Sequence, residues 1–198
     1  MKTIAKDKIN DVLKLLSKGR KLAVPVCDET GKVEFEFVDD VTKAVLYFDN
    51  SHGSIKKFFF GQSQELFSFD KFGSHTVPDS KGMDRVLFGV RPCDAASLEF
   101  MDQIFAKGNY QDPYYMALRD CTSVFVLNCN EPASTCFCQS FDIGPYGHKG
   151  ADVAVYELNK SYCFEAVTEK GQKILDELEL QDANKDHAVR SEEHTSEL

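Results

Sequence analysis

The beginning of the chain passes from helical spacing of its apolar residues to strand-like spacing. Apolar side chains recur at helical intervals over residues 3–18, which predicts an amphipathic helix that ends at Gly19. Residues 21–26 form an apolar run and residues 33–38 alternate apolar with acidic side chains, so both segments are predicted to be strands. Turn-forming residues at positions 28–31 connect them.

The next segment has a weaker pattern. Residues 44–48 predict a further short strand, whereas residues 49–84 are rich in Gly, Ser and Phe and show no clear period. We expect the phenylalanines of this segment to lie in the core or on a docking surface, not in an aromatic platform for a ligand. They are Phe58, Phe59, Phe60, Phe67, Phe69 and Phe72.

The centre of the chain has the pattern of a strand, a helix and a second strand. Residues 85–90 (RVLFGV) and 123–127 (SVFVL) are short apolar runs. Residues 94–105 have helical spacing, and residues 112–120 predict a second helix. Because parallel strands need such a crossover connection, this pattern predicts a right-handed βαβ unit.

The remaining elements lie beyond residue 150. Residues 153–158 and 162–167 are strand-like runs around a turn at 159–161, which predicts an antiparallel hairpin, and residues 171–178 predict a helix. The expected fold class is therefore α/β, with mixed α+β character, a central βαβ crossover with parallel strands and an antiparallel hairpin.

Composition and charge exclude some classes of partner. The chain has 198 residues and a formal net charge of −9. An acidic surface repels a phosphate backbone, so no nucleic-acid partner is expected. No apolar run approaches the ~20 residues that span a bilayer, and charges interrupt the apolar positions near the start, unlike a signal peptide. These features predict a cytoplasmic protein without a membrane span.

The seven cysteines carry the strongest chemical signal. An odd number of cysteines without an export signal favours reduced thiols over disulfides. Most of them gather in the centre of the chain, as is typical of a metal or redox site in a reducing compartment. The clustered residues are Cys93, Cys121, Cys129, Cys136 and Cys138.

Two of these cysteines directly follow the predicted parallel strands. Cys93 comes just after the first strand and Cys129 just after the second. The carboxyl ends of parallel neighbours meet at one edge of the sheet, where α/β proteins bind ligands. Cys136 and Cys138 lie in the turn-rich loop that follows, which is short enough to fold back over this edge. We therefore expect the four thiols to face one crevice.

Four convergent thiolates suit an iron–sulfur centre of the [4Fe–4S] or [2Fe–2S] type. The cationic Arg91 and the start of the predicted helix are expected to stabilise thiolate charge. The spacing lacks both the C-x2-C-x2-C-x3-C pattern of ferredoxins and the paired C-x2-C knuckles of a zinc ribbon. Alternatives at this point are cysteines that pack as small apolar side chains, a structural zinc or scaffolding domain, and a thiol oxidoreductase that uses Cys136 and Cys138.

Other candidate residues have structural explanations. Cys121 precedes a buried strand, and Cys27 and Cys163 are expected to be inert thiols. His148 follows the cysteine loop, where a histidine is more often solvated than a ligand. Asp94 is explained by its place at the start of a helix, near the positive end of the helix dipole.

The end of the chain matches a laboratory sequence. Residues 190–198 (RSEEHTSEL) are the in-frame translation of AGATCGGAAGAGCACACGTCTGAACTC, a common sequencing-library adapter. We expect these residues to be an artefact, so that the natural sequence departs from the printed one at or before Arg190. The expected domain is residues 1–189, with more protein beyond it.

Three ordered motifs in residues 88–145 resemble a known family. The segments FGVRPCDAASLEFMDQIF, DPYYMALRD and VLNCNEPASTCFCQSFDIGP are similar to the beta subunits of cytoplasmic sulfhydrogenases. They are equally similar to the corresponding iron–sulfur subunits of anaerobic sulfite reductases, in the wider group of 4Fe–4S dicluster-domain proteins. The family's RPCD, NC and CFC positions fall on Cys93, Cys129, Cys136 and Cys138, which implies that these four residues hold a cluster, most simply [4Fe–4S].

The resemblance also implies a role and partners. In that family a non-ferredoxin N-terminal domain precedes a C-terminal ferredoxin module with two [4Fe–4S] clusters. The subunit itself is non-catalytic. It relays electrons between a flavin-containing NAD(P)H-oxidising partner and a catalytic hydrogenase or sulfite reductase-like subunit. Because no ferredoxin pattern occurs here, we expect this chain to be the N-terminal domain without the module.

Overall fold

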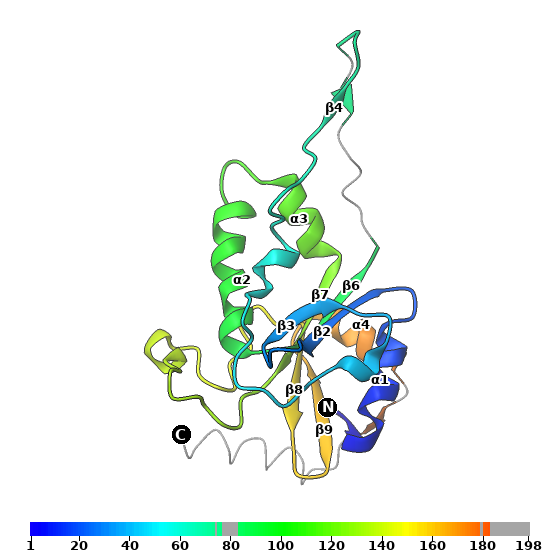
Figure 1. The fold of residues 1–198 in the computed structure, drawn as a ribbon, viewed down its shortest axis with the longest axis vertical. Helices are drawn as coiled ribbons and strands as arrows, with labels where there is room; N and C mark the ends of the chain where they lie inside the picture. Colours follow the sequence, from blue (N-terminus) through cyan, green and yellow to red (C-terminus); the bar gives the residue numbers. More distant parts are fainter. Residues whose placement is uncertain (74, 77–82, 179, 183–198) are drawn as a thin grey trace.

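One eight-stranded sheet runs through the computed structural model, which describes residues 1–73, 75–76, 83–178 and 180–182 (Figure 1). The expected adapter segment, residues 190–198, lies outside the described residues. In their order across the sheet, the strands are β10 (Gln181–Asp182), β1 (Lys2–Ala5), β9 (Ser161–Ala166), β8 (Val153–Glu157), β7 (Thr122–Leu127), β6 (Arg85–Val90), β2 (Lys21–Cys27) and β3 (Val33–Phe37).

The middle of this sheet is parallel and its margins are antiparallel. Strands β8, β7, β6 and β2 are parallel neighbours. At one edge β3 runs antiparallel to β2, and at the other edge β9, β1 and β10 continue the sheet in antiparallel pairs. The predicted mixed α/β class, the parallel strands of the crossover and the β8–β9 hairpin are therefore confirmed.

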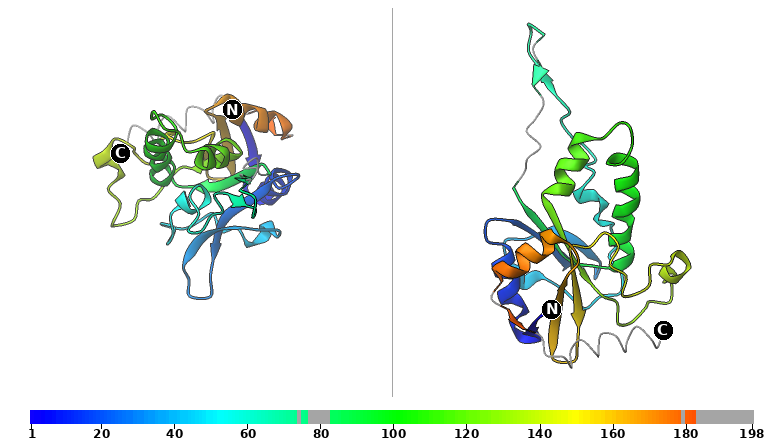
Figure 2. Two further views of the ribbon diagram at one scale, coloured as in Figure 1. Left: turned by 90° about the horizontal axis from the view of Figure 1, so that it is seen from above. Right: turned by 180° about the vertical axis from the view of Figure 1, so that it is seen from behind.

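Helices cover both faces of the sheet (Figure 2). Helices α1 and α4 pack on the face where Phe88 and Phe125 are buried, and α2 and α3 pack on the face of Leu87 and Val124. Because successive strand residues point to opposite faces, β6 and β7 are buried on both sides. The helices are α1 (Ile9–Leu16), α2 (Pro92–Phe105), α3 (Pro113–Asp120) and α4 (Glu169–Glu177). No helix in the described part of the chain is long and apolar enough to cross a membrane.

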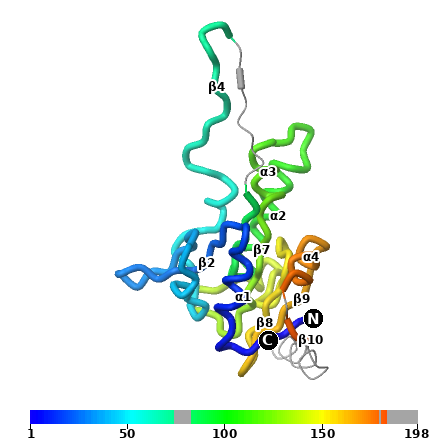
Figure 3. Tube along the Cα trace, turned by 90° about the vertical axis from the view of Figure 1, so that its right-hand side faces the viewer, coloured from blue at the N-terminus to red at the C-terminus, as the bar shows by residue number. Residues whose placement is uncertain are grey.

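The Phe-rich segment divides between the core and the surface. Phe58 and Phe59 are buried against the α2–α3 face of the sheet. Beyond them the chain leaves the body of the molecule, with β4 at the far end of the excursion (Figures 1 and 3). The side chains of Phe60, Phe67, Phe69 and Phe72 are exposed.

Short elements complete the description. The strands β4 and β5 form a separate two-stranded antiparallel sheet. The short strands and 3-10 helices are β4 (Ser68–Phe69), β5 (His75–Thr76), η1 (Lys6–Lys8), η2 (Val41–Lys43), η3 (Ile55–Phe58) and η4 (Cys138–Phe141).

The helix predicted over residues 3–18 is wrong in its first turn. Lys2–Ala5 is a strand that pairs with β9 on one side and β10 on the other, and α1 begins at Ile9. The apolar spacing at the start of the chain is compatible with both states. Backbone pairing with distant strands decides between them, because tertiary contacts override a weak local propensity.

The strand predicted at residues 44–48 is also wrong. Ala44 forms a single bridge with Val26, and the N–H of Val45 donates to the carbonyl of Pro25. Proline has no N–H, so it cannot supply the donor that a longer ladder along this edge of β2 would need.

A β-bulge lies near the end of β6, just before the candidate site. The register with β7 shifts between Phe88 and Val90, and Gly89 between them has φ +87°. A Cβ at Gly89 would lie 3.3 Å from Cδ of Pro25, so backbone conformation and space both favour glycine here. Bulges bend the strand that carries them. This one redirects the chain as it leaves the sheet for α2.

The segment before β8 approaches α2 closely at Gly150, which has φ +75°. A Cβ there would collide with the carbonyl oxygen of Ala95. We predict that Gly150→Ala lowers the free energy of unfolding by about 2 kcal/mol or more, because a left-handed backbone conformation and a backbone clash add together.

Urea denaturation followed by circular dichroism measures this effect. Gly53→Ala is the matched control, because its Cβ would meet only the side chain of Glu34 at an ordinary 3.5 Å. Equal shifts of the unfolding midpoint in the two variants would show that the close approach at Gly150 does not matter.

Candidate metal centre

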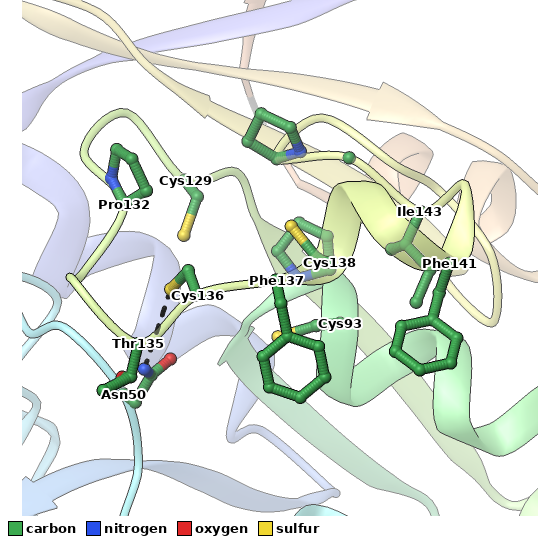
Figure 4. A pocket seen from close by; sticks show the side chains of 13 residues that line it. Asn50, Cys93, Cys129, Pro132, Thr135, Cys136, Phe137, Cys138, Phe141 and Ile143 are labelled. Carbon is green, nitrogen blue, oxygen red and sulfur yellow. Dashed lines mark hydrogen bonds between the residues drawn. The ribbon is translucent and has the colours of Figure 1, made fainter.

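The four predicted cysteines line a single pocket at the carboxyl edge of the parallel strands (Figure 4). Cys93 is the second residue of α2, directly after β6, and Cys129 lies two residues past β7. Cys136 lies in the following loop and Cys138 begins η4. The pocket has a volume of about 290 Å³. The structure therefore brings these thiols together, and their role as ligands stays a prediction.

The loop that carries Cys136 and Cys138 is closed at its base. The backbone N–H of Cys129 donates to the carbonyl of Pro145 at 3.0 Å, which joins the two ends of the loop. Within it, the N–H of Ile143 donates to the carbonyl of Cys138 at 3.3 Å. Compact loops with neighbouring ends hold their own conformation on a surface. This closure keeps the loop beside the strand ends.

The walls of the pocket are largely apolar. The rings of Phe137 and Phe141 lie 5.8 Å apart, with exposed fractions of 67% and 59%. Apolar walls limit the access of water, which is one of the factors that set the potential of a redox centre. The apolar lining residues are Pro92, Pro132, Phe137, Phe141, Ile143 and Pro145.

Arg91, directly before α2, joins three segments around the pocket. Its guanidinium carbon lies 4.3 Å from the centroid of the Phe48 ring, and Nη2 donates to the carbonyl of Phe48. Nη1 donates to the carbonyl of Asn128 at 3.5 Å. Since Asn128 precedes Cys129, Arg91 fixes the end of β7 and the segment around Phe48 to the start of α2.

Burial and charge act in opposite directions on the thiols. Burial raises the pKa of Cys129, the positive charge of Arg91 lowers it, and the neighbouring cysteines raise it again. Burial also raises the pKa of Cys93, with smaller contributions from the Asp94 carboxylate and from other cysteines of the pocket. The expected help from Arg91 is thus present at Cys129, but burial outweighs it. Thiolates that repel one another favour a cationic centre between them.

The grouping of the thiols differs from a ready-made site for one ion. Within the described residues, no three His, Cys, Asp or Glu side chains are grouped so that a metal ion would bind them. A tetrahedral zinc ion at about 2.3 Å from each sulfur holds its ligands about 4 Å apart. A [4Fe–4S] cluster spreads its ligands further, because each cysteine binds a different iron atom. Four thiols around a pocket of this size fit a cluster better than a single zinc ion.

Asn50 also lines the pocket, although no sequence motif singles it out. Its Nδ2 donates to Sγ of Cys136 at a distance of 3.9 Å (Figure 4). Asn50 lies in the stretch 49–84, where the sequence has no period, so no local pattern marks it.

The remaining candidates lie outside the lining of this pocket. Cys163 is buried in β9, Cys121 is half-buried, and Cys27 is exposed at the end of β2. Nε2 of His148 shares a hydrogen bond of 2.9 Å with the hydroxyl of Tyr156. These surroundings agree with the structural explanations expected for the buried Cys163 and for Cys121.

Comparison with known proteins finds a distant relative. The chain is 28% identical over 141 residues to sulfhydrogenase 2 subunit beta of Pyrococcus furiosus. The match covers 71% of this chain but only 41% of that protein, so the chain spans about two fifths of its relative's length. No protein-family profile matches the chain, and no solved structure matches it. The relation is one of distant homology.

Replacing Arg91 tests the electrostatic account of Cys129. Arg91→Met removes the positive charge, so the thiolate of Cys129 becomes less stable and its pKa rises further. We predict that the alkylation rate of Cys129 by iodoacetamide near neutral pH falls about threefold, because the thiolate is the reactive form. Mass spectrometry of the peptide that contains Cys129 measures this rate.

Arg20→Met is the matched control, because Arg20 pairs with Glu177 and does not line the pocket. It is expected to leave the alkylation of Cys129 unchanged. An unchanged rate in Arg91→Met would mean that the guanidinium does not act on this thiol.

Proposed function

We propose that this chain is the cluster-binding part of an electron-transfer subunit in an oxidoreductase complex. The observation that carries the proposal is the pocket lined by four cysteines from two strand ends and one loop. The distant homology to a sulfhydrogenase beta subunit supports this class of complex. Neither support identifies the terminal electron acceptor, because that chemistry belongs to another polypeptide.

Cys93, Cys129, Cys136 and Cys138 would hold a [4Fe–4S] cluster in this proposal. When bound, the cluster supplies one-electron transfer. The chain contributes the remaining properties of the site: apolar walls that limit water, a closed loop that carries two thiols, and the charge of Arg91. A positive charge near the sulfur atoms favours the more negative, reduced state.

The proposed partners are those that the resemblance implies. A flavin-containing NAD(P)H-oxidising subunit would exchange electrons with this chain, as would a catalytic hydrogenase or sulfite reductase-like subunit. We propose that residues 1–189 are one domain of a longer subunit that also carries a ferredoxin module. The matched region amounts to 41% of the relative's length, which agrees with a domain-sized correspondence.

Anaerobic preparation of the chain with iron and sulfide tests this proposal. We expect about four iron and four sulfide atoms per chain and an EPR signal after reduction. Cys136→Ser is predicted to lower the bound iron at least about threefold, because a neutral hydroxyl is a poor substitute for a thiolate. Metal analysis and EPR measure these outcomes.

Cys27→Ser is the matched control, since Cys27 is exposed and lies outside the pocket. It is expected to retain the full cluster. Stoichiometric zinc in place of iron would support the structural zinc alternative. Full iron content in Ser variants of all four pocket cysteines would exclude them as ligands.

A further inference from the structure

A side chain outside the cysteine motifs reaches a sulfur atom of the candidate centre. Nδ2 of Asn50 donates to Sγ of Cys136, although the two residues are 86 positions apart. Within the part of the chain that the structure describes, Asn50 is the side chain that donates a hydrogen bond to a pocket sulfur. Cys136 therefore differs from its three neighbours in its surroundings.

The chain on both sides of Asn50 is fastened to the start of α2. Before it, the carbonyl of Phe48 accepts a hydrogen bond from Arg91. After it, the hydroxyl of Ser54 donates to the carboxylate of Asp94 at 3.0 Å. Arg91 and Asp94 are the residues around the first turn of α2, so two anchors hold the segment that carries the amide.

The same first turn contains Cys93, the second residue of α2. The anchors thus fix the Asn50 segment relative to one predicted ligand, while the amide of Asn50 contacts another, Cys136. Groups that orient the ligands of a metal centre from outside tune its properties. The position of Asn50 is that of such a group.

An N–H group that points at an anionic sulfur stabilises negative charge on that sulfur. Reduction adds negative charge to an iron–sulfur centre, so the donor favours the reduced state more than the oxidised state. Hydrogen bonds to sulfur are among the factors that set cluster potentials. Removing the donor should therefore make reduction harder.

We infer that Asn50 is a positioning residue that raises the reduction potential of a cluster held at Cys136. This inference rests on the proposed function of the site. Asn50 is exposed, and exposed positions tolerate substitution well, so its variants are expected to fold like the wild type.

The test is an EPR-monitored redox titration of the anaerobically prepared full chain. Asn50→Ala removes the donor, and Asn50→Asp keeps the shape but replaces the donor by a negative charge. The potential is expected to fall from wild type to Asn50→Ala and further to Asn50→Asp. For Asn50→Ala, the ratio of reduced to oxidised cluster at a fixed potential should fall by up to tenfold, which equals about 59 mV for one electron.

Asn159→Ala is the matched control, because Asn159 is an exposed amide in the turn between β8 and β9. It is expected to keep the wild-type potential. A wild-type chain without any cluster would overturn the proposed function itself. A wild-type cluster whose potential is unchanged or raised in Asn50→Ala would overturn only the role of Asn50. Loss of the cluster in Asn50→Ala would also overturn that role, because a tuning donor is not needed for binding.

Discussion

The parallel pairing of β6 with β7 is the constraint on which the candidate site depends. Parallel neighbours run in the same direction, so both strands end at the same edge of the sheet and the residues after them emerge side by side. The register from Arg85 opposite Thr122 to Val90 opposite Val126 sets this arrangement for Cys93 and the segment that starts at Asn128. Helices on both faces bury the two strands, which keeps their ends in place.

Arg91 connects this edge to the rest of the molecule. It binds the carbonyls of Asn128, just before Cys129, and of Phe48, near Asn50, so two segments far apart in the sequence close on the first turn of α2. The same geometry buries thiols, and burial raises the pKa of Cys93 and Cys129 despite the nearby guanidinium. A pocket that disfavours free thiolates and crowds several of them is suited to a cationic centre that binds them all.

Much of the fold could be predicted from the sequence, because β6, β7 and the β8–β9 hairpin are continuous apolar runs with clear turns. The strand β1 could not, since its four residues are defined by pairing with β9 at the other end of the chain. For the site, strand ends were enough to predict that four cysteines converge. The role of Asn50 could not be predicted, because its approach to Cys136 depends on contacts of Phe48 and Ser54 with α2.

The central claim is that the four cysteines of the pocket hold one [4Fe–4S] cluster. Anomalous diffraction at the iron edge, from crystals of the anaerobically prepared protein, tests it most directly. The account predicts iron density within the pocket, bonded to the sulfur atoms of Cys93, Cys129, Cys136 and Cys138. A single zinc ion in the pocket, or iron bound by other residues, would contradict the account.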